Sequence, residues 1–289
     1  MPPMSLRKLK AMHTTLRFGR GFSLLEFAIV LAVFAMVLGT FLVPLTKQIE
    51  QQRYTETQRI LESARDALVS FAAANGRLPC PSVDGAAEGP GFEAFSVAPV
   101  GNSGNGSCLN FYSGYLPAVT LGFTPVNDEG YAVDAWGLRQ NRIRYAVSKK
   151  ESPVGNYIFT RANGLNTAPT PADAIEKISD GTYKSLYVCA DKPNPAVGPD
   201  CGLPPPPAAP PNGPLRLANG NAIAVIYSLG ANAADTPSAT EAINSDLAKV
   251  NPVYVSHSLR TTGETFDDVV TWIGPNLLIG RMLAAGRLP

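Results

Sequence analysis

The chain has 289 residues, a net charge of +1 from 24 basic and 23 acidic residues, and 45% hydrophobic residues. This charge balance excludes nucleic-acid binding by bulk positive charge, and the length suffices for one domain with a sizeable core. The motifs G-x-x-x-x-G-K, H-E-x-x-H and G-x-S-x-G are missing. We therefore expect neither enzymatic activity nor a cofactor.

The first 21 residues form a basic leader without an acidic residue, and its cations are Arg7, Lys8, Lys10, Arg17 and Arg20. Residues 22–43 follow as an apolar run, long enough for a membrane-spanning helix of about 20 residues. By the positive-inside rule the leader stays cytoplasmic and the rest of the chain is exported. We therefore predict a single-pass inner-membrane protein with a periplasmic head.

Glu26 is the one charge in the apolar run. At a bilayer centre a carboxylate costs roughly 2.5–3.5 kcal/mol, so we expect it to have a partner. A cleavable secretory signal is one alternative, but its apolar core would be shorter and a small-residue cut site would follow. A plain single-pass anchor is another, but it explains neither Gly21 nor Glu26.

The stretch from Arg20 to Glu26 reads Arg-Gly-Phe-Ser-Leu-Leu-Glu. It resembles the processing site of type IV prepilins and of type II secretion pseudopilins, although Ser23 and Leu25 stand where Thr and Ile are commoner. The resemblance implies that a prepilin peptidase cuts between Gly21 and Phe22 and methylates the new amine of Phe22. It also implies that Glu26 meets the terminal amine of a neighbouring subunit during filament growth.

An amphipathic helix is predicted to continue the apolar run through residues 44–75, with Pro44 as a possible kink. Apolar residues recur there at three- and four-residue intervals, and Asn75-Gly76 is a stop signal. This stripe is expected to dock on the chain's own head, and the first half to pack against neighbours in a filament core. The apolar stripe consists of Ile60, Leu61, Ala64, Ala67, Leu68, Phe71 and Ala72.

The four cysteines are Cys80, Cys108, Cys189 and Cys201. An even count in an exported domain predicts two disulfides, for which three connectivities exist. We favour the nearest pairing, Cys80–Cys108 with Cys189–Cys201. Zinc binding is the rival, but no C-x-x-C spacing is present and His257 is the only histidine after the apolar run.

The head, residues 76–289, is predicted to be α+β with an antiparallel sheet, packed on the long pilin-like N-terminal helix. Residues 80–130 are expected to form a long loop region, and residues 192–214 a proline-rich loop. A short helix is expected from Pro275 to about Gly286. Strands are predicted over 142–148, 156–160, 185–189, 222–229, 252–256 and 266–273.

Asp134-Ala-Trp-Gly137, followed by Arg144-Tyr145, resembles the Asp-x-Trp-Gly…Tyr element of major pseudopilins. We expect Trp136 to anchor the core. In those relatives a neighbouring loop binds calcium, and Asp128, Glu129 and Asp134 offer hard oxygen ligands. No EF-hand spacing accompanies them, so solvated turn residues are the default and no metal is predicted.

The sequence thus predicts a structural subunit, of the minor type because of its length, in a type IV pilus or a type II secretion pseudopilus. Its expected partners are other pilin or pseudopilin subunits, the prepilin peptidase and methyltransferase, an inner-membrane assembly platform and, before assembly, the lipid bilayer. A filament-tip adhesin or binding subunit is the alternative. A membrane-anchored periplasmic enzyme is a more distant one.

Overall fold

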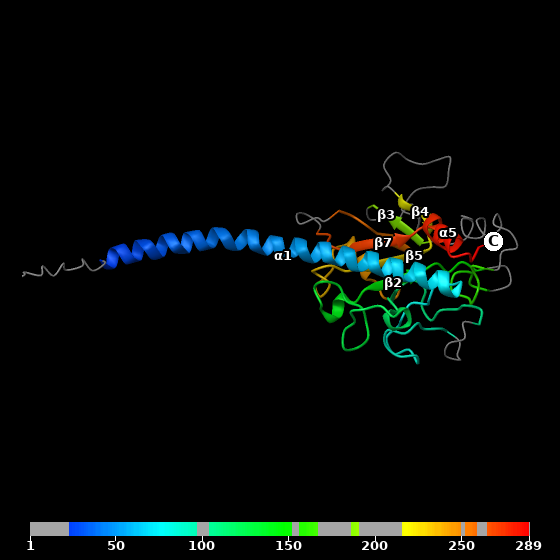
Figure 1. Cartoon of the computed structure of the whole chain (residues 1–289). Helices are drawn as coiled ribbons and strands as arrows, with labels where there is room; N and C mark the ends of the chain where they lie inside the picture. The colour runs from blue at the N-terminus through cyan, green and yellow to red at the C-terminus, as the bar shows by residue number, and fades with distance from the viewer. Residues whose placement is uncertain are drawn as a thin grey trace, which may run out of the picture. The chain divides into compact units, whose positions relative to one another are not determined.

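A computed structural model describes residues 23–96, 104–151, 156–166, 186–190, 216–249, 252–258 and 265–288. The chain divides into two compact units, Met1–Glu50 and Gln51–Pro289, which are described separately. Helix α1 (Leu24–Asn75) runs through both, and unit 2 holds all the strands found in the described residues (Figure 1). The predicted mixture of helix and antiparallel sheet is confirmed for unit 2.

The membrane prediction needs correction. Among the helices of the described residues, none is long and apolar enough to span a bilayer. Helix α1, with 52 residues, is one of the helices to which this finding applies. A spanning helix needs about 20 apolar residues. The predicted spanning segment over 22–43, the long hydrophobic pilin-like helix and the single-pass inner-membrane location are therefore wrong.

Unit 2 contains two sheets. The first has the order β1-β2-β5-β7 and is antiparallel throughout, with Arg144 opposite Tyr227 and Tyr227 opposite Val270. The second has the order β4-β3-β6, and β3 pairs with β6 in parallel, which the antiparallel prediction missed. The strands are β1 (Gly114–Tyr115), β2 (Arg144–Val147), β3 (Leu186–Cys189), β4 (Arg216–Ala222), β5 (Ala224–Ser228), β6 (Val253–Val255) and β7 (Val269–Ile273).

The remaining elements are short. Helix α2 (Ala118–Leu121), the 3₁₀ turn η1 (Arg139–Asn141) and helix α4 (Glu241–Ser245) lie in connections, and α5 (Pro275–Ala284) confirms the predicted C-terminal helix. Strand β4 was missed. The strand predicted over 156–160 was wrong, because Tyr157 makes only an isolated bridge with Glu151 and a turn follows.

The predicted stripe on α1 supplies the core of unit 2. Leu61, Ala64, Leu68 and Ala72 have at most 1% of their surface exposed. They belong to one hydrophobic cluster with Tyr145 and Val147 of β2, Ala224 and Ile226 of β5, and Leu278 and Met282 of α5. The opposite face of the first sheet joins Leu186, Val188 and Tyr254 of the second in another cluster. The first sheet is thus covered on both faces.

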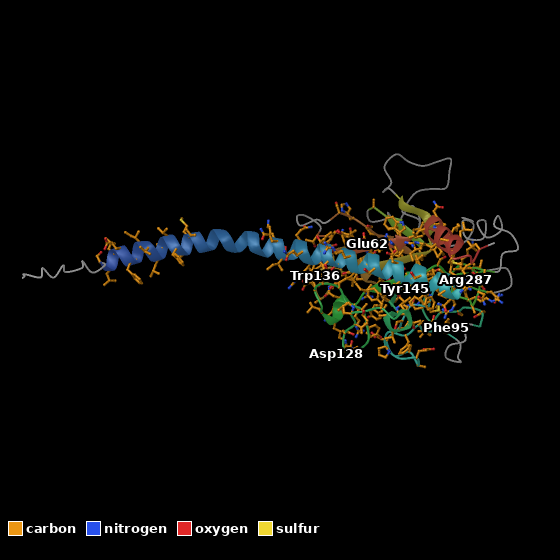
Figure 2. All side chains as sticks on the ribbon, viewed as in Figure 1. Glu62, Phe95, Asp128, Trp136, Tyr145 and Arg287 are labelled. Carbon is orange, nitrogen blue, oxygen red and sulfur yellow. A yellow bond between two sulfur atoms is a disulfide. The ribbon has the colours of Figure 1, made fainter. Side chains whose placement is uncertain are left out.

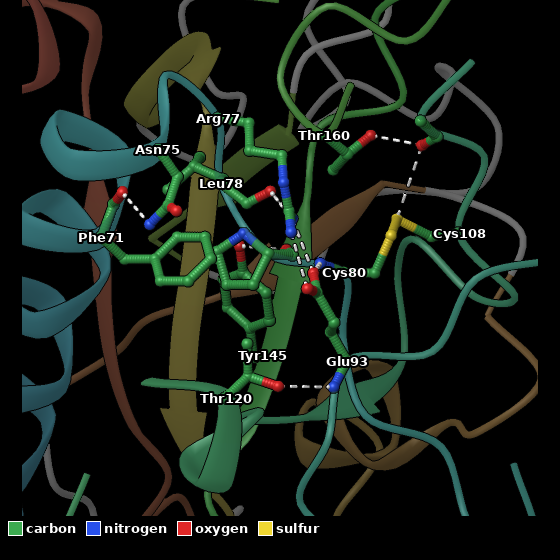
Figure 3. A network of polar contacts seen from close by, with 12 residues as sticks. Phe71, Asn75, Arg77, Leu78, Cys80, Glu93, Cys108, Thr120, Tyr145 and Thr160 are labelled. Atoms are coloured by element: carbon green, nitrogen blue, oxygen red, sulfur yellow. Dashed lines mark hydrogen bonds and ion pairs between the residues drawn. A yellow bond between two sulfur atoms is a disulfide. The ribbon is translucent and has the colours of Figure 1, made fainter. Parts of the chain in front are cut away.

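A polar network fixes the C-terminal end of α1 (Figure 3). Arg77 makes a bidentate ion pair with Glu93, with Nη1–Oε2 and Nη2–Oε1 distances of 2.6 and 2.7 Å. The Cys80 N–H donates to the same carboxylate at 3.2 Å, and the Glu93 N–H donates to Thr120. The Arg77 guanidinium also lies 5.2 Å from the ring centre of Phe71.

The chain's C-terminal end completes this anchorage. Arg287 Nε donates to the carbonyl of Ala73 at 2.8 Å, and Nη2 donates to that of Ala74 at 2.6 Å. These carbonyls belong to the last turn of α1, which lacks intrahelical donors. Figure 2 shows Arg287 beside that end of the helix.

The Arg77–Glu93 pair yields a stability prediction. Arg77→Met keeps the aliphatic stem but leaves the Glu93 carboxylate buried without its cation. Breaking a buried pair from one side costs about 3–5 kcal/mol, so the thermal midpoint should fall by roughly 10 °C. The double variant Arg77→Met with Glu93→Gln should recover part of the loss. Calorimetric midpoints that fall equally in the single and double variants would contradict this assignment.

Candidate functional site

Unit 1 exposes a set of large apolar side chains on α1, here called the N-terminal apolar surface. At about 100° per residue, their positions are distributed around the whole circumference of the helix. A helix that is apolar on all sides is normally buried against other apolar groups. The set comprises Leu24, Leu25, Phe27, Ile29, Val30, Leu31, Val33, Phe34, Met36 and Val37, each at least 46% exposed.

Glu26 forms a capping box at the start of this helix. The Ser23 N–H donates to Glu26 Oε2 at 2.9 Å, and the Glu26 N–H donates to Ser23 Oγ at 3.2 Å. The pair satisfies two backbone donors, and the carboxylate lies near the positive end of the helix dipole. The S-x-x-E spacing could have predicted this. Gly21 and Phe22 lie outside the described residues, so cleavage and the assembly role of Glu26 stay predictions.

The cysteine prediction is confirmed for one pair. Cys80 and Cys108 form a disulfide that joins segments 28 residues apart in sequence. Both are buried in the same hydrophobic cluster as the stripe of α1. Cys189 is also disulfide-bonded, whereas Cys201 lies outside the described residues. Its pairing with Cys189 therefore stays a prediction.

Asp134 is the buried centre of the Asp-x-Trp-Gly element. Its carboxylate accepts hydrogen bonds from the N–H groups of Trp136 and Gly137 at 2.9 and 3.4 Å, from Asn141 Nδ2 at 2.9 Å, and from the Ser228 hydroxyl. Burial raises the pKa of Asp134, and these hydrogen bonds oppose the rise. The side chain thus joins a turn to the end of β5 and is not a solvated turn residue.

Trp136 does not anchor the core as predicted. Its side chain is half-buried and belongs to neither main hydrophobic cluster, whereas Tyr145 is fully buried and donates to the Pro79 carbonyl at 3.1 Å. Figure 2 shows Trp136 and Tyr145 well apart along the head. The aromatic anchor of the element is therefore its tyrosine.

The oxygen ligands considered around Asp134 do not converge on one point. Asp128 is exposed, and Glu129 makes ion pairs with Arg142 and Arg139. The carboxylate of Asp134 already accepts four donors. The arrangement is thus a set of hydrogen bonds and ion pairs within the loop.

A carboxylate cluster that the sequence analysis missed lies at the start of β7. Single oxygens of Glu241, Asp267 and Asp268 lie within 4.8 Å of one another, and a cavity of about 70 Å³ borders Glu241 and Asp268. Such a group could attract a hard cation. Amide groups already donate to two of these carboxylates. Asp267 Oδ2 accepts from the backbone N–H groups of Ala231 and Asn232 at 2.7 and 3.1 Å. The Glu241 carboxylate accepts from Asn232 Nδ2 and from the backbone N–H groups of Ser238 and Asp267.

Protonation relieves the repulsion in this cluster. Burial, together with the neighbouring Glu241, raises the pKa of Asp267 to about 6. Burial also raises the pKa of Asp268 well above its ordinary value. Glu241 keeps its charge, because hydrogen bonds from Ser238 and Asn232 outweigh its burial and lower its pKa. The cluster can therefore hold protons under mildly acidic conditions.

A strap of chain, residues 241–249, connects this cluster to the free edge of β6, the edge that pairs with no other strand of the described residues. Asn244 donates from Nδ2 to Asp268 Oδ2 and to the Val255 carbonyl, both at 2.8 Å, and its Oδ1 accepts from the Val255 N–H at 2.9 Å. Lys249 donates from Nζ to the Val253 carbonyl at 2.7 Å and to that of Ile243. No sequence motif marks these residues, because their contacts form only in three dimensions.

Comparisons of the chain with protein-family models, with characterised proteins and with solved structures gave no match.

The carboxylate cluster predicts a pH dependence. Because the folded pKa of Asp267 lies above its ordinary value of 3.8, the native state binds this proton more tightly than the unfolded chain. Its contribution to stability is thus present at low pH and is lost as pH rises from about 4 to 6. Asp267→Asn should remove this loss and raise the thermal midpoint by a few degrees at pH 7.5, because the amide can donate to Glu241.

Asp235→Asn is the matched control, since Asp235 is exposed at the same cavity. Midpoints measured between pH 4 and 7.5 should fall less steeply in Asp267→Asn than in the control and the wild type. An unchanged slope would show that Asp267 does not hold the proton.

Proposed function

We propose that this protein is a structural subunit of a pilin- or pseudopilin-type filament. The N-terminal apolar surface would pack against the corresponding helices of other subunits. The observation that carries the proposal is the distribution of exposed apolar side chains around the whole helix from Leu24 to Val37. The prepilin-like sequence from Arg20 to Glu26 supports it independently.

The distribution of these side chains also sets how many neighbours are needed. A single partner helix, as in a two-stranded coiled coil, covers one stripe of a helix and leaves the other side in water. Leu25, Val30 and Leu31 lie roughly a third of a turn apart around α1, so at least three neighbours are required to cover them. A filament interior supplies this number, and a dimer does not.

Glu26 has a second role in this proposal. The capping box uses one oxygen, Oε2, for the Ser23 N–H and holds the carboxylate at the helix start. The other oxygen is then available to the terminal amine of a neighbouring subunit after cleavage at Gly21. This pairing would set the axial register between subunits, and it requires processing by a prepilin peptidase.

The large head favours a minor subunit. Removing 21 of 289 residues leaves a long mature chain, most of which belongs to unit 2. A filament-tip binding subunit is the second candidate, because the connections of unit 2, including the short helix α2, expose large apolar side chains that a partner could cover. These are Phe92, Leu109, Val119 and Val126, each at least 39% exposed.

Filament incorporation tests the proposal. The full chain would be expressed with a pilus or secretion-pseudopilus assembly system, and sheared filaments would be probed for it. Wild type should appear there with Phe22 as its first residue by mass. Phe34→Asp should reduce incorporation at least about tenfold, because it places an unpaired charge among apolar neighbours. Leu138→Asp, an exposed position in unit 2, is the control and should incorporate normally. Equal incorporation of both variants, or absence of wild type from filaments, would refute the proposal.

A pair of Glu26 variants separates capping from pairing with a neighbour. Glu26→Gln keeps a capping-box side chain but removes the charge, whereas Glu26→Ala removes both. If the carboxylate pairs with an amine, both variants should incorporate poorly while circular dichroism shows the helix intact in Glu26→Gln. Normal incorporation of Glu26→Gln would limit Glu26 to capping.

A further inference from the structure

The free edge of β6 brings an amine and a carboxamide together. Strand β6 pairs with β3 along one edge, and on its other edge the side chains of Lys249 and Asn244 take the place of a neighbouring strand. Their backbone partners, Val253 and Val255, are separated by a single residue. Lys249 Nζ also donates to the carbonyl of Ile243, the residue directly before Asn244. The lysine amine and the asparagine carboxamide are thus held along the same short edge of β6.

The surroundings of Asn244 suit attack at its side-chain carbonyl carbon. Asn244 has no exposed surface, and the Val255 N–H points at its Oδ1 from 2.9 Å. A backbone donor in this position stabilises negative charge that develops on the oxygen. Asp268, which is 3% exposed, lies 2.8 Å from the leaving nitrogen Nδ2, and burial favours its protonated form. A buried acid at the leaving group can act as a general acid.

The surroundings of Lys249 suit a nucleophile. Its side chain is 7% exposed and lies 4.4 Å from the ring centre of Tyr254. Its hydrogen bonds go to two neutral carbonyls. Burial, with a smaller contribution from the cation Arg144, lowers the pKa of Lys249 to about 7 although Asp246 and Asp268 oppose the shift. A desolvated lysine with a large uncharged fraction is the form that attacks carbonyl carbons.

We propose that Lys249 and Asn244 form an intramolecular isopeptide bond, with Asp268 as the catalytic acid. The lone pair of Nζ attacks Cγ of Asn244, and the Val255 N–H stabilises the resulting oxyanion. Asp268 gives its proton to Nδ2, the Cγ–Nδ2 bond breaks, and ammonia leaves. Asp268 then regains a proton from Nζ. The amine and the carboxamide become a secondary amide plus ammonia, so no co-reactant is needed.

The bond would close the strap covalently over the edge of β6. An unpaired strand edge invites pairing with other chains, and side chains alone cover it reversibly. A covalent link makes the cover permanent. This inference concerns unit 2 alone and does not depend on the proposed filament function.

Peptide mapping of the purified full chain, reduced and alkylated, tests the bond. Trypsin does not cut after an acylated lysine, so linked protein should give one peptide, 217–260, lighter than its sequence by one ammonia. Separate peptides 217–249 and 250–260 would overturn the proposal. A succinimide at Asn244 also loses ammonia, but it leaves Lys249 cleavable, and that result would overturn the proposal as well.

Two controls make the test specific. Asn141 donates to the buried Asp134 at 2.9 Å and has no lysine among its described contacts, so its peptide should keep its full mass. Asp268→Asn preserves a hydrogen-bonding side chain but not the acid, and it should slow linkage at least about 100-fold. Circular dichroism establishes that this variant is folded. A folded Asp268→Asn protein that is linked as fully as wild type would exclude Asp268 as the catalytic acid.

Discussion

Helix α1 carries apolar side chains along two stretches. The side chains of one stretch are buried in the core of unit 2, and those of the other are exposed. From Leu61 to Ala72 a single stripe packs into the core of unit 2, where β2, β5 and α5 enclose it. From Leu24 to Val37 the apolar side chains lie on every side and are exposed. The first stretch explains how the helix is held by the head, and the second is the surface that the proposed partner subunits would cover.

The head is adapted to hold the helix rigidly. The Arg77–Glu93 pair and Arg287 fix the C-terminal end of α1, the Cys80–Cys108 disulfide lies within the same core, and Asp134 joins a turn to β5. Such links resist separation of the helix from the sheet.

The sequence predicted the features that depend on local pattern. The period of Leu61, Ala64, Leu68 and Ala72 identified the buried stripe, and Asn75-Gly76 identified the helix end. Strands β2, β3, β5, β6 and β7 and helix α5 were predicted within a few residues. The membrane-spanning helix was predicted from the apolar run over 22–43 and was wrong, because no helix of the described residues is long and apolar enough to span a bilayer.

Long-range contacts could not be predicted in the same way. The parallel pairing of β3 with β6 joins segments far apart in sequence, and no local pattern specifies it. The carboxylate cluster unites Glu241 with Asp267 and Asp268 only after β7 forms. Trp136 was expected to anchor the core because it lies in the element that resembles Asp-x-Trp-Gly…Tyr. Tyr145 is the buried residue instead, because it faces α1 from the first sheet.

Protection of Met36 on assembly tests the central claim most directly. Met36 is 77% exposed in the isolated chain, whereas Met282 in α5 is fully buried. Oxidative labelling of the free protein should modify Met36 readily and spare Met282. In assembled filaments the account predicts that Met36 becomes at least about tenfold less reactive while Met282 stays protected. Equal oxidation of Met36 in free and assembled protein would contradict the claim that other subunits cover the N-terminal apolar surface.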